Sequence, residues 1–160
     1  MTRARRADPS RDLLKIAVVE RYGRGRVGVG LLHGLGLRDG AMASSVAHDA
    51  HNIVVVGATD EDMAVAVREI ERLQGGLVIS RNGAIVDRLP LPIGGIMSPA
   101  PAAEVAEALE RLDRQVKDLG VSIDHPFGFL SFLALSVVPR LKITDLGVLD
   151  VDAWDIVPIQ

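Results

Sequence analysis

The sequence contains no cysteine, so disulfide bridges and thiolate metal ligands are both excluded. A chain of 160 residues does not need such bridges. A single domain of this size buries about 68–70% of the surface that its unfolded form exposes. Absence of cysteine is typical of reducing compartments, and we therefore expect a cytoplasmic location.

Long apolar runs are also missing. No stretch reaches the ~18 apolar residues that a membrane-spanning helix requires, and the longest near-apolar segment covers only residues 126–138. The N-terminal residues lack the apolar segment of a signal peptide. We therefore expect no membrane partner.

Charge of one sign is concentrated only at the N-terminus. Four arginines against Asp8 give residues 1–11 a net charge of +3, which leaves −6 on the rest of a chain whose total is −3. We predict a disordered basic leader over residues 1–12 and one domain over residues 13–160. An acidic body is unsuited to nucleic acid, so we expect no nucleic-acid partner.

Aromatic residues make up only 3% of the chain, whereas apolar residues make up 48%. The core must therefore consist mainly of Val, Leu, Ile and Ala. The mean hydropathy of +0.26 is high for a monomer of this size. It indicates either an unusually complete core or a surface that docks on another protein, and we favour the docking surface.

Hydrophobic periodicity and turn residues predict eight strands, at residues 13–20, 27–33, 41–47, 53–58, 77–80, 84–89, 141–144 and 147–151. Asn82-Gly83 is typical of a tight hairpin turn. Helices are predicted after the cap Thr59, from Ser98-Pro99 to Gly120, and within residues 126–138 after a cap at Asp124. The last of these is apolar all round, which predicts burial on every side. This order predicts an α+β fold: a single domain with a mixed, largely antiparallel sheet covered by helices.

The segment Gly23-Arg24-Gly25-Arg26-Val27-Gly28 matches the dinucleotide-binding pattern G-x-G-x-x-G. The third glycine of that pattern should open a helix, yet the following residues continue as a strand. We therefore expect these glycines to serve tight turns and close approach between strands.

Polar groups are most concentrated between the third and fourth predicted strands. His48, Asp49, His51 and Asn52 are our candidate site residues. They are open to three interpretations: a polar network that satisfies a buried connection, a pair of histidine metal ligands, or a loop that completes an active site formed mostly by another domain. Two histidines and one aspartate fall short of a closed metal site, and His33 and His125 add no matching pattern.

Several segments together resemble the C-terminal domain of microbial adenine deaminases. In chain order they are LLKIAVVERYG, VGVGLLHGLGLRDGAMASSVAHDAHNIVVVGATDEDMAVAV, GGLVIS, LPLPIGGIMS and FLSFLALSVVPRLKITDLGVLDV. The resemblance implies a metal-dependent amidohydrolase of purine salvage, in which manganese or iron held by a barrel domain activates water. Adenine is then hydrolysed to hypoxanthine and ammonia. Implied partners are the barrel domain, adenine and further copies of the chain in a homo-oligomer.

The chain departs from that family of enzymes in having no His-x-His pair or further set of barrel ligands. We therefore expect it to bind no metal and to be inactive alone. Within the resemblance, His48 and His51 would bond substrate nitrogens or orient the metal-bound water through Asp49, while Asn52 fixes the loop. The alternatives are a stand-alone binding or assembly module without catalytic activity, and an independent hydrolase that uses the His48 cluster.

Overall fold

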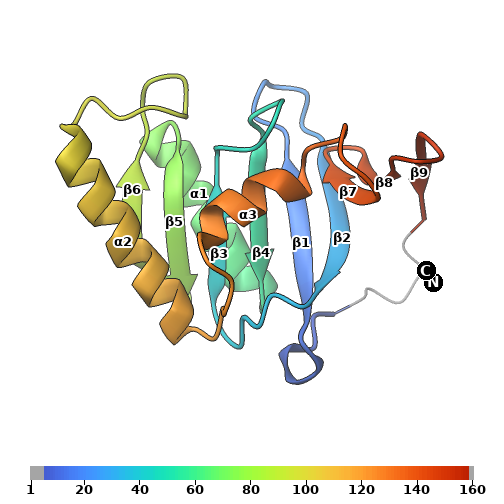
Figure 1. Cartoon of the computed structure of the whole chain (residues 1–160), viewed down its shortest axis with the longest axis horizontal. Helices are drawn as coiled ribbons and strands as arrows, with labels where there is room; N and C mark the ends of the chain where they lie inside the picture. The colour runs from blue at the N-terminus through green and yellow to red at the C-terminus, as the bar shows by residue number, and fades with distance from the viewer. Residues whose placement is uncertain (1–5, 159–160) are drawn as a thin grey trace.

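A six-stranded antiparallel sheet forms the middle layer of the structure, a computed structural model that describes residues 6–158 (Figure 1). Its strands are β1 (Leu13–Val19), β2 (Val27–His33), β3 (Ala41–Ser44), β4 (Ile53–Gly57), β5 (Gly76–Arg81) and β6 (Ala84–Pro90). The strand order is β2-β1-β4-β3-β5-β6, and every neighbouring pair is antiparallel.

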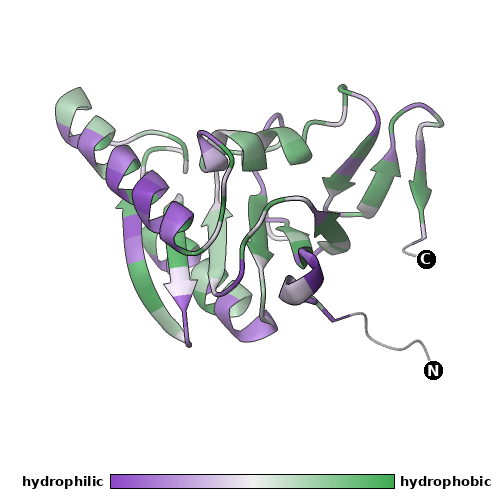
Figure 2. Ribbon diagram, turned by 60° about the horizontal axis from the view of Figure 1, so that its bottom comes forward, coloured by the Kyte–Doolittle hydropathy of each residue, from purple (hydrophilic) through white to green (hydrophobic). Residues whose placement is uncertain are grey.

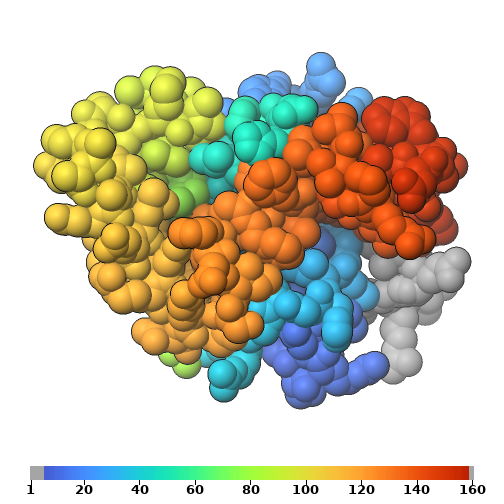
Figure 3. Space-filling view, viewed as in Figure 1, coloured from blue at the N-terminus to red at the C-terminus, as the bar shows by residue number. Residues whose placement is uncertain are grey.

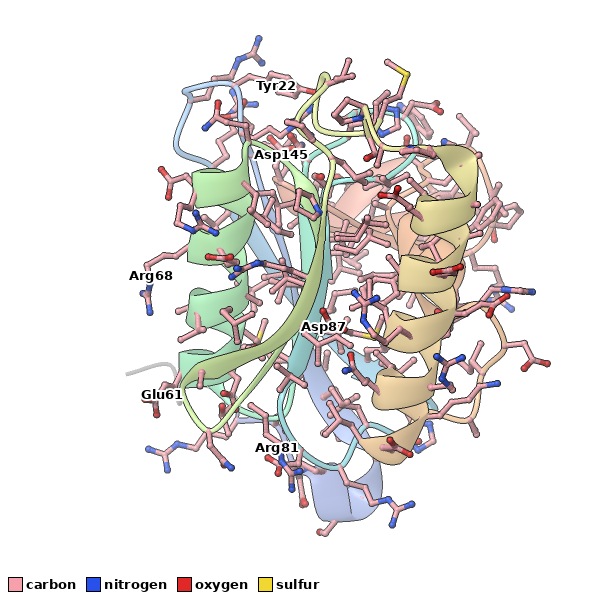
Figure 4. The ribbon with its side chains drawn as sticks, turned by 90° about the vertical axis from the view of Figure 1, so that its left-hand side faces the viewer. Tyr22, Glu61, Arg68, Arg81, Asp87 and Asp145 are labelled. Atoms are coloured by element: carbon pink, nitrogen blue, oxygen red, sulfur yellow. The ribbon has the colours of Figure 1, made fainter. Side chains whose placement is uncertain are left out.

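Helices cover both faces of this sheet (Figure 4). Helix α1 (Asp60–Leu73) lies on one face, and α2 (Ala102–Asp118) and α3 (Pro126–Leu133) lie on the other. A second sheet of β7 (Leu141–Thr144), β8 (Gly147–Asp150) and β9 (Asp155–Val157) packs beside α3 at the β2 end. The predicted α+β architecture is confirmed for the described residues. None of their helices has the length and apolar character to cross a membrane.

Alternation along the strands divides the core in two. On β1 and β4, Ala17 and Val55 pack under α1, whereas Ile16 and Val56 face α2 and α3. Small residues dominate the α1 side, which lets that helix approach the sheet closely. Because both faces are covered, every residue of β4 is buried, and its sequence is a continuous apolar run.

Local signals in the sequence fix α1 and the hairpin after it. The Thr59 hydroxyl accepts a hydrogen bond of 3.2 Å from the Asp62 backbone N–H, as predicted for a helix cap. The Asp62 carboxylate in turn accepts a bond of 2.9 Å from the backbone N–H of Gly83. Asn82 and Gly83 have the positive φ angles, 54° and 74°, that the predicted tight turn requires.

The glycines of β2 allow the small sheet to approach, as expected. A Cβ atom on Gly28 would overlap the Thr144 carbonyl and lie 2.6 Å from the Gly147 nitrogen. One on Gly30 would lie 3.0 Å from the Val148 side chain. The G-x-G-x-x-G segment thus continues into a strand, and no helix follows it.

The edge strand β6 is tied to helices on both faces by two adjacent residues. Arg88 donates to Glu69 of α1 at 2.7 Å, and Asp87, which is labelled in Figure 4, accepts from Arg111 of α2 at 2.6 Å. The hydrogen bond from Arg72 lowers the pKa of Glu69 although burial opposes this, and the bond from Arg111 lowers the pKa of Asp87. Charge pairing of this kind also keeps the edge strand from pairing with other chains.

Three sequence predictions are wrong at element ends. Helix α2 begins at Ala102, since the Ser98 hydroxyl accepts from the Ala100 N–H in a local turn. Strand β3 ends at Ser44, whose hydroxyl accepts from the Val46 N–H at 2.9 Å and turns the chain. Asp124 does not cap α3, because its carboxylate pairs with Lys117.

The predicted burial of the last helix on every side is also wrong. Helix α3 ends at Leu133, and Phe132 remains 54% exposed. Strand β9 was not predicted, because three residues are too few to show a period. Within the predicted leader, Pro9–Arg11 forms a 3₁₀ turn. Residues 1–5 of that leader lie outside the described part of the chain.

We expect Gly28→Ala to lower the free energy of unfolding by about 1–3 kcal/mol, because the added methyl group forces the two sheets apart. The control is Gly128→Ala, where the nearest atom to a new Cβ is 3.8 Å away inside α3. It should raise stability by about 0.5–1 kcal/mol. Urea denaturation measures both, and equal effects would contradict the packing argument.

We expect Glu69→Gln to cost about 1 kcal/mol at neutral pH, since both arginine partners are about half exposed. The folded-state pKa of Glu69 is lowered from 4.5, so its stabilisation is present above that pH. It is lost as pH falls through the folded pKa, and the two proteins should converge in acid. Denaturation from pH 7 to pH 3 tests this, with Glu71→Gln on the exposed face of α1 as control. If the difference in unfolding free energy between Glu69→Gln and the parent protein did not change with pH, the ionised Glu69 carboxylate would not be its cause.

Candidate functional site

The four candidate residues lie in the loop between β3 and β4, at the upper edge of the sheet in Figure 1. This edge also carries the turn between β1 and β2, and the loop touches α3. The loop therefore joins three segments that are far apart in the sequence.

Hydrogen bonds hold the loop in place from both sides. The Tyr22 hydroxyl donates to the Ala50 carbonyl at 2.6 Å, and the His48 backbone N–H donates to the Ser131 hydroxyl at 3.3 Å. Ser131 lies on α3 and is buried. These two contacts fix the loop against the β1–β2 turn and the helix.

Within the loop, His51 acts as a structural acceptor. Its backbone N–H donates to the Ala47 carbonyl at 2.7 Å, and its Nδ1 accepts from the Ala47 N–H at 3.3 Å. Because Nδ1 accepts, the neutral ring carries its proton on Nε2. The interpretation as a satisfied polar network thus applies to His51.

The two histidine rings lie together at the surface. The ring centroid of His48 is 5.9 Å from that of His51 and 5.7 Å from that of Phe132. His48 and Asp49 are exposed, and within residues 6–158 no hydrogen bond joins the Asp49 carboxylate to either ring. The loop thus exposes the His48 ring and the Asp49 carboxylate at the surface of the described structure.

Asn52 is the buried member of the group, with only 6% of its surface exposed. Its Oδ1 has no hydrogen-bond partner among the described residues. It borders a cavity of about 230 Å³ that also contacts Ser136, Thr144 and Asp145. An unpaired buried acceptor costs about 1–3 kcal/mol, so we expect Asn52 Oδ1 to accept a hydrogen bond from a group outside the described residues, such as water in the cavity.

An apolar groove lies on the other side of His48, at a position that the sequence did not predict. It has a volume of about 330 Å³ and opens between α2 and α3, where the space-filling surface is hollowed (Figure 3). We call it the α2–α3 groove; its lining is Ser44, Val46, His48, Leu77, Leu89, Leu91, Ile96, Val105, Leu109, Phe127, Gly128, Ser131 and Phe132. His48 therefore lies between a cavity of mixed lining and an apolar groove.

A family model for the adenine deaminase C-terminal domain matches residues 2–155. The chain belongs to this family. It is 52% identical over 152 residues to adenine deaminase 2 of Carboxydothermus hydrogenoformans, and 48% identical over 151 residues to adenine deaminase of Brucella abortus. Adenine deaminase of Cereibacter sphaeroides is 49% identical over 155 residues. The resemblance seen in the sequence is confirmed.

This adenine deaminase C-terminal domain corresponds to only part of those relatives. The alignments cover 94–96% of the chain but 26–27% of each of these three relatives. The chain therefore spans about a quarter of the length of the curated relatives it matches.

The described residues of this domain, 6–158, do not by themselves assemble the ligands of a manganese or iron site. Over residues 6–158, no group of three or more His, Cys, Asp or Glu side chains is placed to hold a metal ion. His33 and His125 are exposed, and the His125 Nδ1 lies 3.8 Å from the Asp113 carboxylate. The described residues thus lack the donor set that a metal-activated water needs.

We expect Ser131→Ala to loosen the loop by removing the acceptor of the His48 N–H. The loss should be about 1 kcal/mol, with several-fold faster amide exchange at His48. Ser136→Ala, in which the hydroxyl makes no hydrogen bond to the described residues, is the control. Hydrogen exchange followed by NMR measures both, and an unchanged rate at His48 would show that α3 does not hold the loop.

Proposed function

We propose that this chain is the C-terminal domain of a metal-dependent adenine deaminase, which hydrolyses adenine to hypoxanthine and ammonia in purine salvage. The observation that carries the proposal is the family match over nearly the whole chain, combined with its span of about a quarter of the relatives. In this proposal the remaining part of the protein forms the barrel and holds manganese or iron. The domain packs on that barrel in the cytoplasm.

The His48–Asn52 loop is, in this proposal, the part of the domain that approaches the reaction site. Support comes from its exposed His48 ring and its unpaired Asp49 carboxylate, which project from an anchored backbone. The Nε2–H of His51 adds a donor beside them. Groups held in this way orient a substrate at low entropic cost, because few rotors must be fixed on binding.

A chimaeric enzyme tests the domain assignment. The matched segment of Carboxydothermus hydrogenoformans adenine deaminase 2 is replaced by this chain, which is 52% identical to it. With added manganese, the purified chimaera should release ammonia from adenine, and the 160-residue chain alone should not. An inactive, folded chimaera would refute the assignment, and an active isolated chain would refute the division of roles.

We expect His48→Ala combined with His51→Ala in the chimaera to lower kcat/KM for adenine by about 10- to 100-fold, since positioned groups contribute on this scale. His33→Ala, an exposed histidine at the end of β2, is the matched control and should leave kcat/KM unchanged. Steady-state ammonia release measures kcat/KM for the parent chimaera, the double variant and the His33→Ala control. Full activity of the double variant would remove the loop from the reaction site.

A further inference from the structure

Exposed apolar side chains gather along the α2–α3 groove. Ile96, Leu109 and Phe132 line it and are each at least 36% exposed, and Met97 next to Ile96 is 54% exposed. In Figure 2, helix α3 is largely hydrophobic along its length, whereas α2 carries hydrophilic residues on its outer side. The groove thus lies between the uncharged helix α3 and the side of α2 that is opposite its hydrophilic residues.

The groove lining contains no Lys, Arg, Asp or Glu. His48 is its one titratable side chain, and the floor is formed by buried Leu77, Leu89 and Leu91. Covering such a surface is favourable because it removes apolar area from water. An apolar segment fits it, and a charged one does not.

We propose that the α2–α3 groove is where the rest of the deaminase polypeptide docks, through an apolar element that lies against Phe132 and next to His48. This inference rests on the proposed function. It names the surface of the domain that meets the catalytic part. One contact then covers the groove and places the His48–Asn52 loop at the interface.

The relatives explain why this occupant is favoured. About three quarters of their length lies outside the match, and that part belongs to the same polypeptide. A tethered neighbour is present at an effective concentration of about millimolar, so even a modest groove is filled.

Hydroxyl-radical footprinting of the isolated chain and of the chimaera tests this contact. Phe132 and Met97 should be oxidised at least five-fold more slowly in the chimaera. Trp154, which is 68% exposed between β8 and β9, is the internal control and should react equally in both.

Variants give an independent measurement. Phe132→Asp in the chimaera should abolish the protection of Met97 and lower deamination at least ten-fold. The matched control is Leu146→Asp, at a side chain 59% exposed in the β7–β8 turn, which should change neither. The Tm of the isolated chain should change by less than 2 °C in both variants, which separates lost docking from unfolding.

The outcomes distinguish the two proposals. An active chimaera with Phe132 and Met97 still fully reactive overturns the groove and leaves the proposed function intact. An inactive chimaera with a protected groove supports docking and counts against the function. Protection that appears in the isolated chain as its concentration rises identifies a second copy as the occupant, and overturns the inference.

Discussion

The requirement to cover both faces of one antiparallel sheet organises this domain. The face of the sheet under α1 carries several alanines, and this one amphipathic helix covers it. The opposite face carries the larger aliphatic side chains, so α2, α3 and part of the small sheet must share it. The three-stranded sheet packs closely against the six-stranded sheet because β2 has glycines at the contact. Coverage on this side ends at the α2–α3 groove, where Phe132 remains half exposed.

Elements with local signals were predictable from the sequence. Thr59 with its hydrogen bond to the Asp62 N–H, the positive φ angles at Asn82-Gly83, and the alternation in β1 and β2 each depend on residues only a few positions apart. Helix α3 was different, because an all-round apolar helix has the same sequence whether the chain itself or another protein covers it. The start of α2 was missed because a Ser-Pro opening also suits a local turn, which Ser98 adopts here.

The candidate site was predictable in position but not in geometry. A cluster of short polar side chains between two apolar runs located the loop, since few other residues fit such a connection. The partners that fix its shape lie far along the chain: Ser131 is 83 residues from His48, and Tyr22 is 28 residues from Ala50. No periodicity encodes contacts of that separation. The different roles of the two histidines, one bonded through Nδ1 and one exposed, follow from those contacts.

The high mean hydropathy is explained by the residues of the core together with the exposed apolar side chains. Aliphatic residues that fill two core layers explain most of it, and exposed side chains such as Phe132, Met97 and Val137 are the remainder. Phe132 is also the side chain that faces the His48 ring, at 5.7 Å between centroids. Any group that covers Phe132 therefore changes the surroundings of His48 at the same time. Packing on this face and the surroundings of the His48 ring are thus coupled through a single pair of rings.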